Sequence, residues 1–230
     1  MKTVVIHQPD FIPWLGFFDR LLQADLFVAL DSVQFVHSNR SWTHRDKIKT
    51  ARGEQWVTVS VKKPSRTALI NEVVLADGTN WRQDNLNLIA ANYKAARFFD
   101  EVFPAVRDLY GRPCMLLTDF TLSSIEMLMD MLAIRVPVVR SSTLGASGAK
   151  SELLVDILVR VGATHYLSGV GARAYLDSSP FEAKGIKVRW QDFTHPVYPQ
   201  LHGAFIPMLS TLDMLFNCGI ADSRSILRGA

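Results

Sequence analysis

Apolar and polar residues alternate along this chain in blocks that predict strands and helices in turn. Near the start, the β-branched run Thr3–Ile6 is followed by a polar loop, an amphipathic segment at 17–24 and a second apolar run at 26–30. A strand, a helix and a second strand within about 30 residues are typical of the βαβ unit of a parallel sheet. Residues 1–48 are therefore expected to organise the rest of the chain.

The same alternation continues to the end of the chain. Strands are predicted at 55–61, 137–140, 164–169 and 185–190, and helical spacing dominates 80–133, 150–161 and the segment after Ser210. Ser210 is expected to cap that last helix, with Asp213 as the second member of a capping box. These elements predict a Rossmann-like, doubly wound α/β fold with a mainly parallel sheet. The prediction is one domain over residues 1–230, with a helical insertion at about 80–133.

Composition excludes several classes of protein. With 48% hydrophobic and 20% charged residues, the chain is ordinary for a globular protein. A net charge of +3 suits an anionic ligand. The chain has no concentrated stripe of basic residues, so nucleic acid is not predicted as a partner, apart from an aminoacyl-tRNA that acts as donor. No spacing of His, Cys, Asp or Glu residues along the chain is typical of a metal site. Two cysteines without a partner motif, strand-like sequence directly after Met1 and no apolar run of membrane-spanning length predict a cytoplasmic protein. The oligomeric state is not predicted.

Polar side chains follow both strands of the first βαβ unit. His7 and Gln8 come directly after the first strand, and Asp31 ends the second. Because ligands of parallel sheets bind beyond the carboxyl ends of the strands, these residues are candidates for one site. His7 is the candidate general base, and a capped strand end is the alternative. Gln8 suits a sugar hydroxyl or a base edge, and Asp31 suits a sugar hydroxyl or an Asx turn.

Nearby loops add aromatic and cationic groups. Trp14 is a candidate stacking platform for a base or a sugar ring, and Gly16 at a helix start suits the approach of an anion. Both residues are equally typical of packing. Asn39, Trp42 and Arg45 lie in a dense polar stretch. Guanidinium groups there suit a diphosphate, and a solvated basic loop is the alternative.

Two later segments are candidates for the other half of the site. Ser168 and Gly169 end a strand and open a helix, so their backbone amides suit an anion. They do not complete a dinucleotide fingerprint, and NAD is not predicted. His195, Tyr198 and Gln200 lie in a proline-constrained stretch after the last strand. His195 is a second candidate base, and a structural loop is the alternative.

In combination, these motifs resemble the WbqC-like family. The resemblance rests on His7-Gln8-Pro9, Pro13-Trp14-Leu15-Gly16-Phe17, Asp31-Ser32-Val33-Gln34-Phe35, Trp42, Arg45, Tyr166-Leu167-Ser168-Gly169, His195-Pro196-Val197-Tyr198-Pro199-Gln200, Phe205, Ser210, Asp213 and Asn217-Cys218-Gly219. It covers essentially the whole chain and implies a bacterial protein of surface-polysaccharide or O-antigen biosynthesis. One departure is His44, where the family pattern favours Asn.

Three hypotheses for the function follow. The first is a transferase acting on a nucleotide-linked amino sugar by acyl or aminoacyl transfer, with His7 or His195 as base and Arg45 on the pyrophosphate. The second is a nucleotidylyl- or adenylyl-forming enzyme that uses ATP and Mg²⁺. It rests on a weaker similarity of Pro13–Gly16 to class I synthetases, whose paired histidines are absent here. The third is a non-catalytic partner in a polysaccharide-assembly complex. Outside the second hypothesis, the sequence requires no cofactor.

Overall fold

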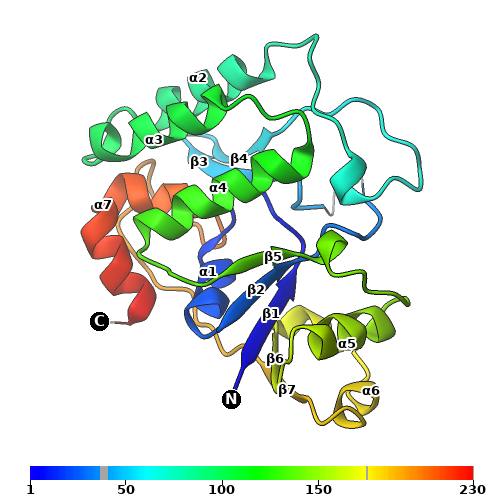
Figure 1. The fold of residues 1–230 in the computed structure, drawn as a ribbon. Helices are drawn as coiled ribbons and strands as arrows, with labels where there is room; N and C mark the ends of the chain where they lie inside the picture. Colours follow the sequence, from blue (N-terminus) through cyan, green and yellow to red (C-terminus); the bar gives the residue numbers. More distant parts are fainter. Residues whose placement is uncertain (37–40, 175, 230) are drawn as a thin grey trace.

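The centre of the computed structural model, which describes residues 1–36, 41–174 and 176–229, is a five-stranded parallel sheet (Figure 1). The strand order is β5-β2-β1-β6-β7, and every pair of neighbours is parallel. The strands are β1 (Thr3–His7), β2 (Leu26–Ala29), β5 (Val138–Arg140), β6 (His165–Ser168) and β7 (Lys187–Trp190). The predicted mixed α/β fold with a mainly parallel sheet is confirmed.

Helices cover both faces of this sheet, which explains why the middle of β1 and the whole of β2 are apolar. Val5 and Phe27 belong to the larger core, together with side chains of the helices α1 (Leu15–Leu22), α4 (Leu117–Met131) and α7 (Thr211–Arg228). The alternate residues Val4 and Val28 belong to a second core beneath α5 (Ser151–Arg160) and α6 (Ser179–Glu182). The sheet therefore separates two apolar cores.

A long excursion between β2 and β5 holds a hairpin and three helices. The antiparallel hairpin is β3 (Arg45–Thr50) with β4 (Gly53–Thr58), and the helices are α2 (Trp81–Tyr93), α3 (Phe99–Gly111) and α4. The periodicity of 80–133 thus corresponds to helices, as predicted. Arg45, by contrast, begins a strand rather than extending the polar loop, because Asp46 and Ile48 alternate into the interior. Short 3-10 turns stand at Ile70–Glu72, Ser141–Thr143 and Val170–Ala172.

The start of α7 confirms one half of the predicted capping box and corrects the other. The Ser210 hydroxyl accepts a hydrogen bond from the amide of Leu212 at 3.3 Å, as an N-cap does. The Asp213 carboxylate is fully buried and accepts hydrogen bonds from Tyr93 and Gln200 instead. The capping-box role of Asp213 was wrong because distant chain segments reach its carboxylate. In the part of the chain that is described, no helix is long and apolar enough to cross a membrane.

The loop between β1 and α1 is held in a strained conformation. Ile12 has a φ of 39°, in the left-handed region that β-branched residues rarely enter. Two buried serines hold it there: the Ser124 hydroxyl accepts from the Ile12 amide at 3.1 Å, and the Ser210 hydroxyl donates to the Ile12 carbonyl at 2.7 Å. These contacts fix the path of residues 8–13, which carry the side chains considered next.

Candidate functional site

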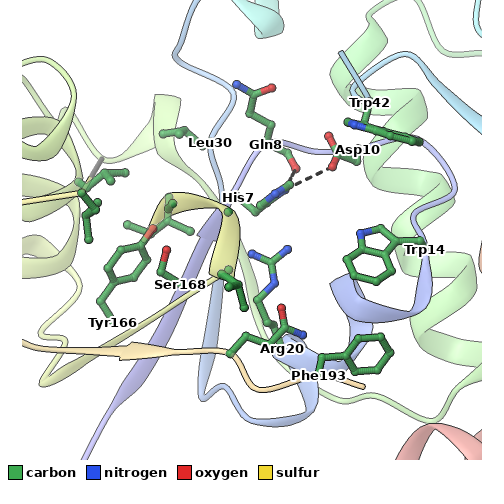
Figure 2. A pocket seen from close by; sticks show the side chains of 18 of the residues that line it. His7, Gln8, Asp10, Trp14, Arg20, Leu30, Trp42, Tyr166, Ser168 and Phe193 are labelled. Carbon is green, nitrogen blue, oxygen red and sulfur yellow. Dashed lines mark hydrogen bonds and ion pairs between the residues drawn. The ribbon is translucent and has the colours of Figure 1, made fainter. Parts of the chain in front are cut away.

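A cleft of about 730 Å³ opens at the carboxyl ends of β1 and β6 (Figure 2). The chain runs from β1 to β2 and β5 on one side, and from β6 to β7 on the other. Parallel sheets bind their ligands beyond the strand ends where the connections diverge in this way. The lining comes from β1 and the loop after it, α1, the residue that follows β2, the loops before β3 and α7, α5, β6 with the turn after it, and the segment that follows β7.

His7 is fixed in one orientation at the end of β1. Its Nδ1 lies 3.0 Å from the carbonyl oxygen of Gln8 and 3.5 Å from Oδ2 of Asp10. Because a carbonyl only accepts hydrogen bonds, we assign the proton of the neutral ring to Nδ1, which leaves the lone pair on Nε2. Desolvation and the nearby Arg20 guanidinium lower the pKa of His7 to about 3. The imidazole is therefore neutral near pH 7.

Asp10 lies beside His7 with little access to water. Burial raises the pKa of this carboxyl group to about 7, although the positive charge of Arg20 opposes the shift. Asp46, fully buried at the second position of β3, also has a pKa well above its usual value because of desolvation, and Asp10 adds to that shift. The interior next to His7 thus disfavours negative charge on both carboxyl groups.

Arg20 is a buried cation at the cleft that forms no salt bridge with any described residue. The side chain belongs to α1, is 5% exposed and lines the cleft. Its Nε atom has no hydrogen-bond partner, and among the described residues Arg20 forms no salt bridge. Desolvation lowers the pKa of the guanidinium, which Asp10 partly opposes. A buried charge without a partner is costly, so Arg20 is suited to an anion that enters the cleft.

Two further residues complete the polar part of the cleft. Gly169 leaves room for the guanidinium, because a Cβ at this position would lie 3.3 Å from Nη1 of Arg20. The Ser41 hydroxyl is buried, lines the cleft and has no hydrogen-bond partner among the residues that the structure describes. An unsatisfied buried hydroxyl costs free energy in the empty protein, and a ligand that bonds to it removes that cost.

The cleft brings together several residues that the sequence singled out, from segments far apart in the chain. Those lining it are His7, Gln8, Trp14, Trp42, Ser168 and Gly169. Gln8 is held by Thr43, whose hydroxyl donates to its Oε1 at 2.9 Å. These contacts join the loop after β1 to the loop before β3.

Other candidates lie outside the cleft. The Asp31 carboxylate is fully buried and accepts hydrogen bonds from Ser141 and Ser142, so it ties the end of β2 to the end of β5. The guanidinium carbon of Arg45 lies 4.1 Å from the ring centre of Trp56, in a cation–π contact on the hairpin. Asn39 falls outside the described residues.

His195, Tyr198 and Gln200, which follow β7, pack next to the cleft without lining it. The ring of His195 is stacked with Trp14, their centres 6.3 Å apart, and its Nδ1 lies 2.8 Å from the Pro196 carbonyl. Gln200 donates to Asp213 at 2.7 Å, and Tyr198 is buried in the same region. The predicted second half of the site therefore lies behind the Trp14 wall and does not line the cleft.

Arg20, Asp10 and Ser41 are the cleft residues that sequence reasoning missed. The one available signal was Arg20, an arginine among apolar residues in the short helix LGFFDRLL. Asp19 and Arg20 are neighbours there, and only the packing shows which of them is buried. Within the described chain, no group of three or more His, Cys, Asp or Glu side chains is arranged to hold a metal ion.

Comparison with known proteins now identifies the family. The profile of the WbqC-like protein family matches residues 8–225. The chain belongs to the WbqC-like family. A similar protein is the uncharacterized protein Rv1507c of Mycobacterium tuberculosis (strain ATCC 25618 / H37Rv), 34% identical over 232 residues, covering 99% of this chain and 98% of the relative. No solved structure matches the chain. The match covers all the segments that line the cleft of this WbqC-like protein, apart from Ile6 and His7 at the end of β1.

Gly16 has a packing role in this WbqC-like protein, and replacing it tests the Trp14 wall. A Cβ at position 16 would lie 2.2 Å from Cη2 of Trp14, so Gly16→Ala is expected to displace the indole and to destabilise the protein by about 1–3 kcal/mol. Near-ultraviolet circular dichroism and urea unfolding report both effects. Gly171→Ala is the matched control, because nothing lies within 4 Å of a Cβ there. Equal behaviour of the two variants would contradict this packing.

Proposed function

We propose that this WbqC-like protein is a transferase of surface-polysaccharide (O-antigen) biosynthesis that acts on an anionic, nucleotide-linked amino sugar. The observation that carries the proposal is the unpaired, buried Arg20 in the same cleft as a neutral, oriented His7. The first group suits a phosphate, and the second presents an unprotonated Nε2 whose lone pair can accept a proton. In the hypothesis from sequence, Arg45 held the pyrophosphate; Arg20 replaces it here because Arg45 lies over Trp56.

The reaction that fits this arrangement is acyl or aminoacyl transfer to the amine of the sugar. The amine attacks the carbonyl carbon of the donor, a C–N bond forms, and the bond to the leaving group breaks with its electron pair on that group. The proton lost by the amine passes to Nε2 of His7. The Gln8 carbonyl, 3.0 Å from Nδ1, favours the imidazolium formed in this step, because its hydrogen bond raises the pKa of His7.

The architecture supports this proposal. The strand order, with helices on both faces, favours a Rossmann-like, doubly wound domain over residues 1–230 that carries the helices at about 80–133 as an insertion. We also propose a cytoplasmic location, since the two cysteines, Cys114 and Cys218, are free, as expected in a reducing compartment.

The adenylyl-forming alternative has less support from the cleft. It requires the turn Pro13–Gly16 to hold a triphosphate, but Gly16 serves to accommodate the Trp14 indole, and its carbonyl accepts a hydrogen bond from Gln191 at 2.8 Å. The non-catalytic alternative leaves the neutral His7 and the unpaired Arg20 without a role.

The test is a binding panel followed by a turnover assay. UDP- and dTDP-linked amino sugars, the free sugars, and ATP with Mg²⁺ are compared by thermal shift. A ligand at 100 times its Kd stabilises the native state by about 2.7 kcal/mol. We expect nucleotide-linked sugars to bind, and His7→Gln to keep binding while acyl transfer falls by a factor on the order of 10²–10⁴. Exchange of labelled pyrophosphate into ATP would favour the adenylyl-forming alternative, and silence across the panel would favour the non-catalytic one.

A further inference from the structure

The mouth of the cleft is apolar, and the reaction above does not account for this. Four large apolar side chains of the lining stay exposed to water: Val36 (49%), Trp42 (37%), Val170 (55%) and Met208 (52%). They come from the loop before β3, the turn after β6 and the loop before α7. Segments so far apart in the sequence bring apolar side chains to one opening, a feature typical of a ligand-binding groove.

The deeper walls of the cleft are also largely apolar. Leu30, Leu154, Leu176 and Phe193 contribute to the lining together with the indole of Trp14. Two of the polar side chains in the lining are already engaged: Gln191 donates to the Gly16 carbonyl and to Asp19, and Gln8 accepts from Thr43.

The unpaired polar groups indicate where the charged group and the apolar chain of a ligand would lie. Arg20 is buried and Ser41 keeps an unsatisfied hydroxyl, and both line the same cleft. A ligand that satisfies these groups and also covers the apolar walls has an anionic group joined to an apolar chain.

We propose that the cleft binds the acyl donor of the reaction, an anion that carries an aliphatic acyl chain. Its anionic group pairs with Arg20, and its chain lies along the apolar walls towards Trp42, Val170 and Met208. This inference rests on the proposed acyl transfer. It deepens that proposal by naming the class of the donor, and it assigns Arg20 to the donor in place of the pyrophosphate of the sugar. The nucleotide-linked sugar would then present its amine at the cleft opening.

Alkyl phosphates of increasing length are the probe, because they keep the charge constant while the chain grows. Isothermal titration calorimetry of the whole protein with inorganic, ethyl, butyl and hexyl phosphate measures Kd. We expect Kd to fall about fourfold for each methylene group that the cleft buries. Val170→Ser is expected to reduce this dependence, whereas Val197→Ser, which removes a 78% exposed valine outside the lining, leaves it unchanged.

Each outcome decides one part of the inference. Affinity that does not depend on chain length, in a protein that binds nucleotide-linked sugars and loses that binding in Arg20→Met, would overturn the acyl-donor site and leave the proposed function standing. A chain-length dependence that persists in Arg20→Met would overturn the assigned orientation. Absence of binding by every phosphate would overturn the inference outright. Affinity that rises with chain length, in a protein that does not bind nucleotide-linked sugars, would support the acyl-donor site. It would count against the nucleotide-linked sugar as the acceptor.

Discussion

Replacing Arg20 by methionine is expected to remove anion binding while leaving the protein at least as stable as the unmodified chain. Arg20 is 5% exposed, its Nε has no partner in the described part of the chain, and no described carboxylate forms a salt bridge with it. Replacement of buried charges by apolar side chains of similar volume is often neutral or stabilising by about 1–4 kcal/mol. The same change removes the group that pairs with the ligand, which typically costs about 2–5 kcal/mol of binding, a factor of roughly 30 to 5,000 in Kd.

Two measurements on the same variant separate these effects. Urea unfolding gives the free energy of unfolding without ligand, and calorimetry gives the Kd of a ligand identified in the panel above. Arg140→Met is the matched control, because Arg140 pairs with Asp119 at the surface and lies outside the cleft lining. That control is expected to lose at most about 1 kcal/mol of stability and no affinity.

The opposite pattern would refute the role of Arg20. A large loss of stability with unchanged ligand affinity would mean that the guanidinium supports the fold rather than the ligand. Unchanged stability and unchanged affinity would place the anion elsewhere. The expected gain in stability with loss of binding is the usual signature of a residue kept for function at the cost of stability.

Asp213→Ala is expected to cause the largest loss of stability, about 3–5 kcal/mol. The carboxylate is fully buried and accepts hydrogen bonds of 2.7 Å from the Tyr93 hydroxyl and from the Gln200 amide. Lys49 is also buried, donates to the carbonyls of Gly203 and Ala204, and its positive charge acts on Asp213. Truncation would leave two buried donors unpaired and a buried ammonium without its compensating charge.

Thermal unfolding measures this effect directly. For a domain of this size the loss corresponds to a Tm decrease on the order of 10 °C. Asp222→Ala is the control on the same helix, because Asp222 is exposed, and a change within about 0.5 kcal/mol is expected. Equal stability of the two variants would show that the Asp213 network does not hold α7, α2 and the tail together. A decrease in Tm for Asp213→Ala but not for Asp222→Ala would establish that the Asp213 network holds these segments together.

The network of Asp213 also explains the placement of the tail residues. Gln200 donates to Asp213 and to the carbonyl of Ile206, which fixes the loop that follows the last strand. His195 lies in that loop and stacks on Trp14, so the tail supports a wall of the cleft. Residues that the sequence marked as a second half-site thus contribute through Trp14, and a stability defect in the tail is expected to weaken ligand binding as well.

Local patterns in the sequence were enough to predict the parallel sheet and the position of His7 and Gln8 at the end of its first strand. Apolar runs and helical spacings reflect which faces of each element are covered, and the parallel strands carry neighbouring groups to the same edge of the sheet. The arrival of Ser168 and Gly169 at this edge follows from the same rule.

Only the tertiary structure decided which charged groups face the cleft. Arg20 and Asp19 are adjacent in one short helix, and the packing of α1 against the rest of the fold buries the first of them at the cleft. Arg45 resembled a phosphate ligand in sequence, but hairpin pairing across β3 and β4 places its guanidinium over Trp56. Asp213 resembled a helix cap, but Tyr93 and Gln200 reach it from remote segments. The periodicity of apolar residues along the chain shows which face of each helix or strand is buried. The partner of a charged group depends instead on which distant segments meet, and that is determined by the fold as a whole.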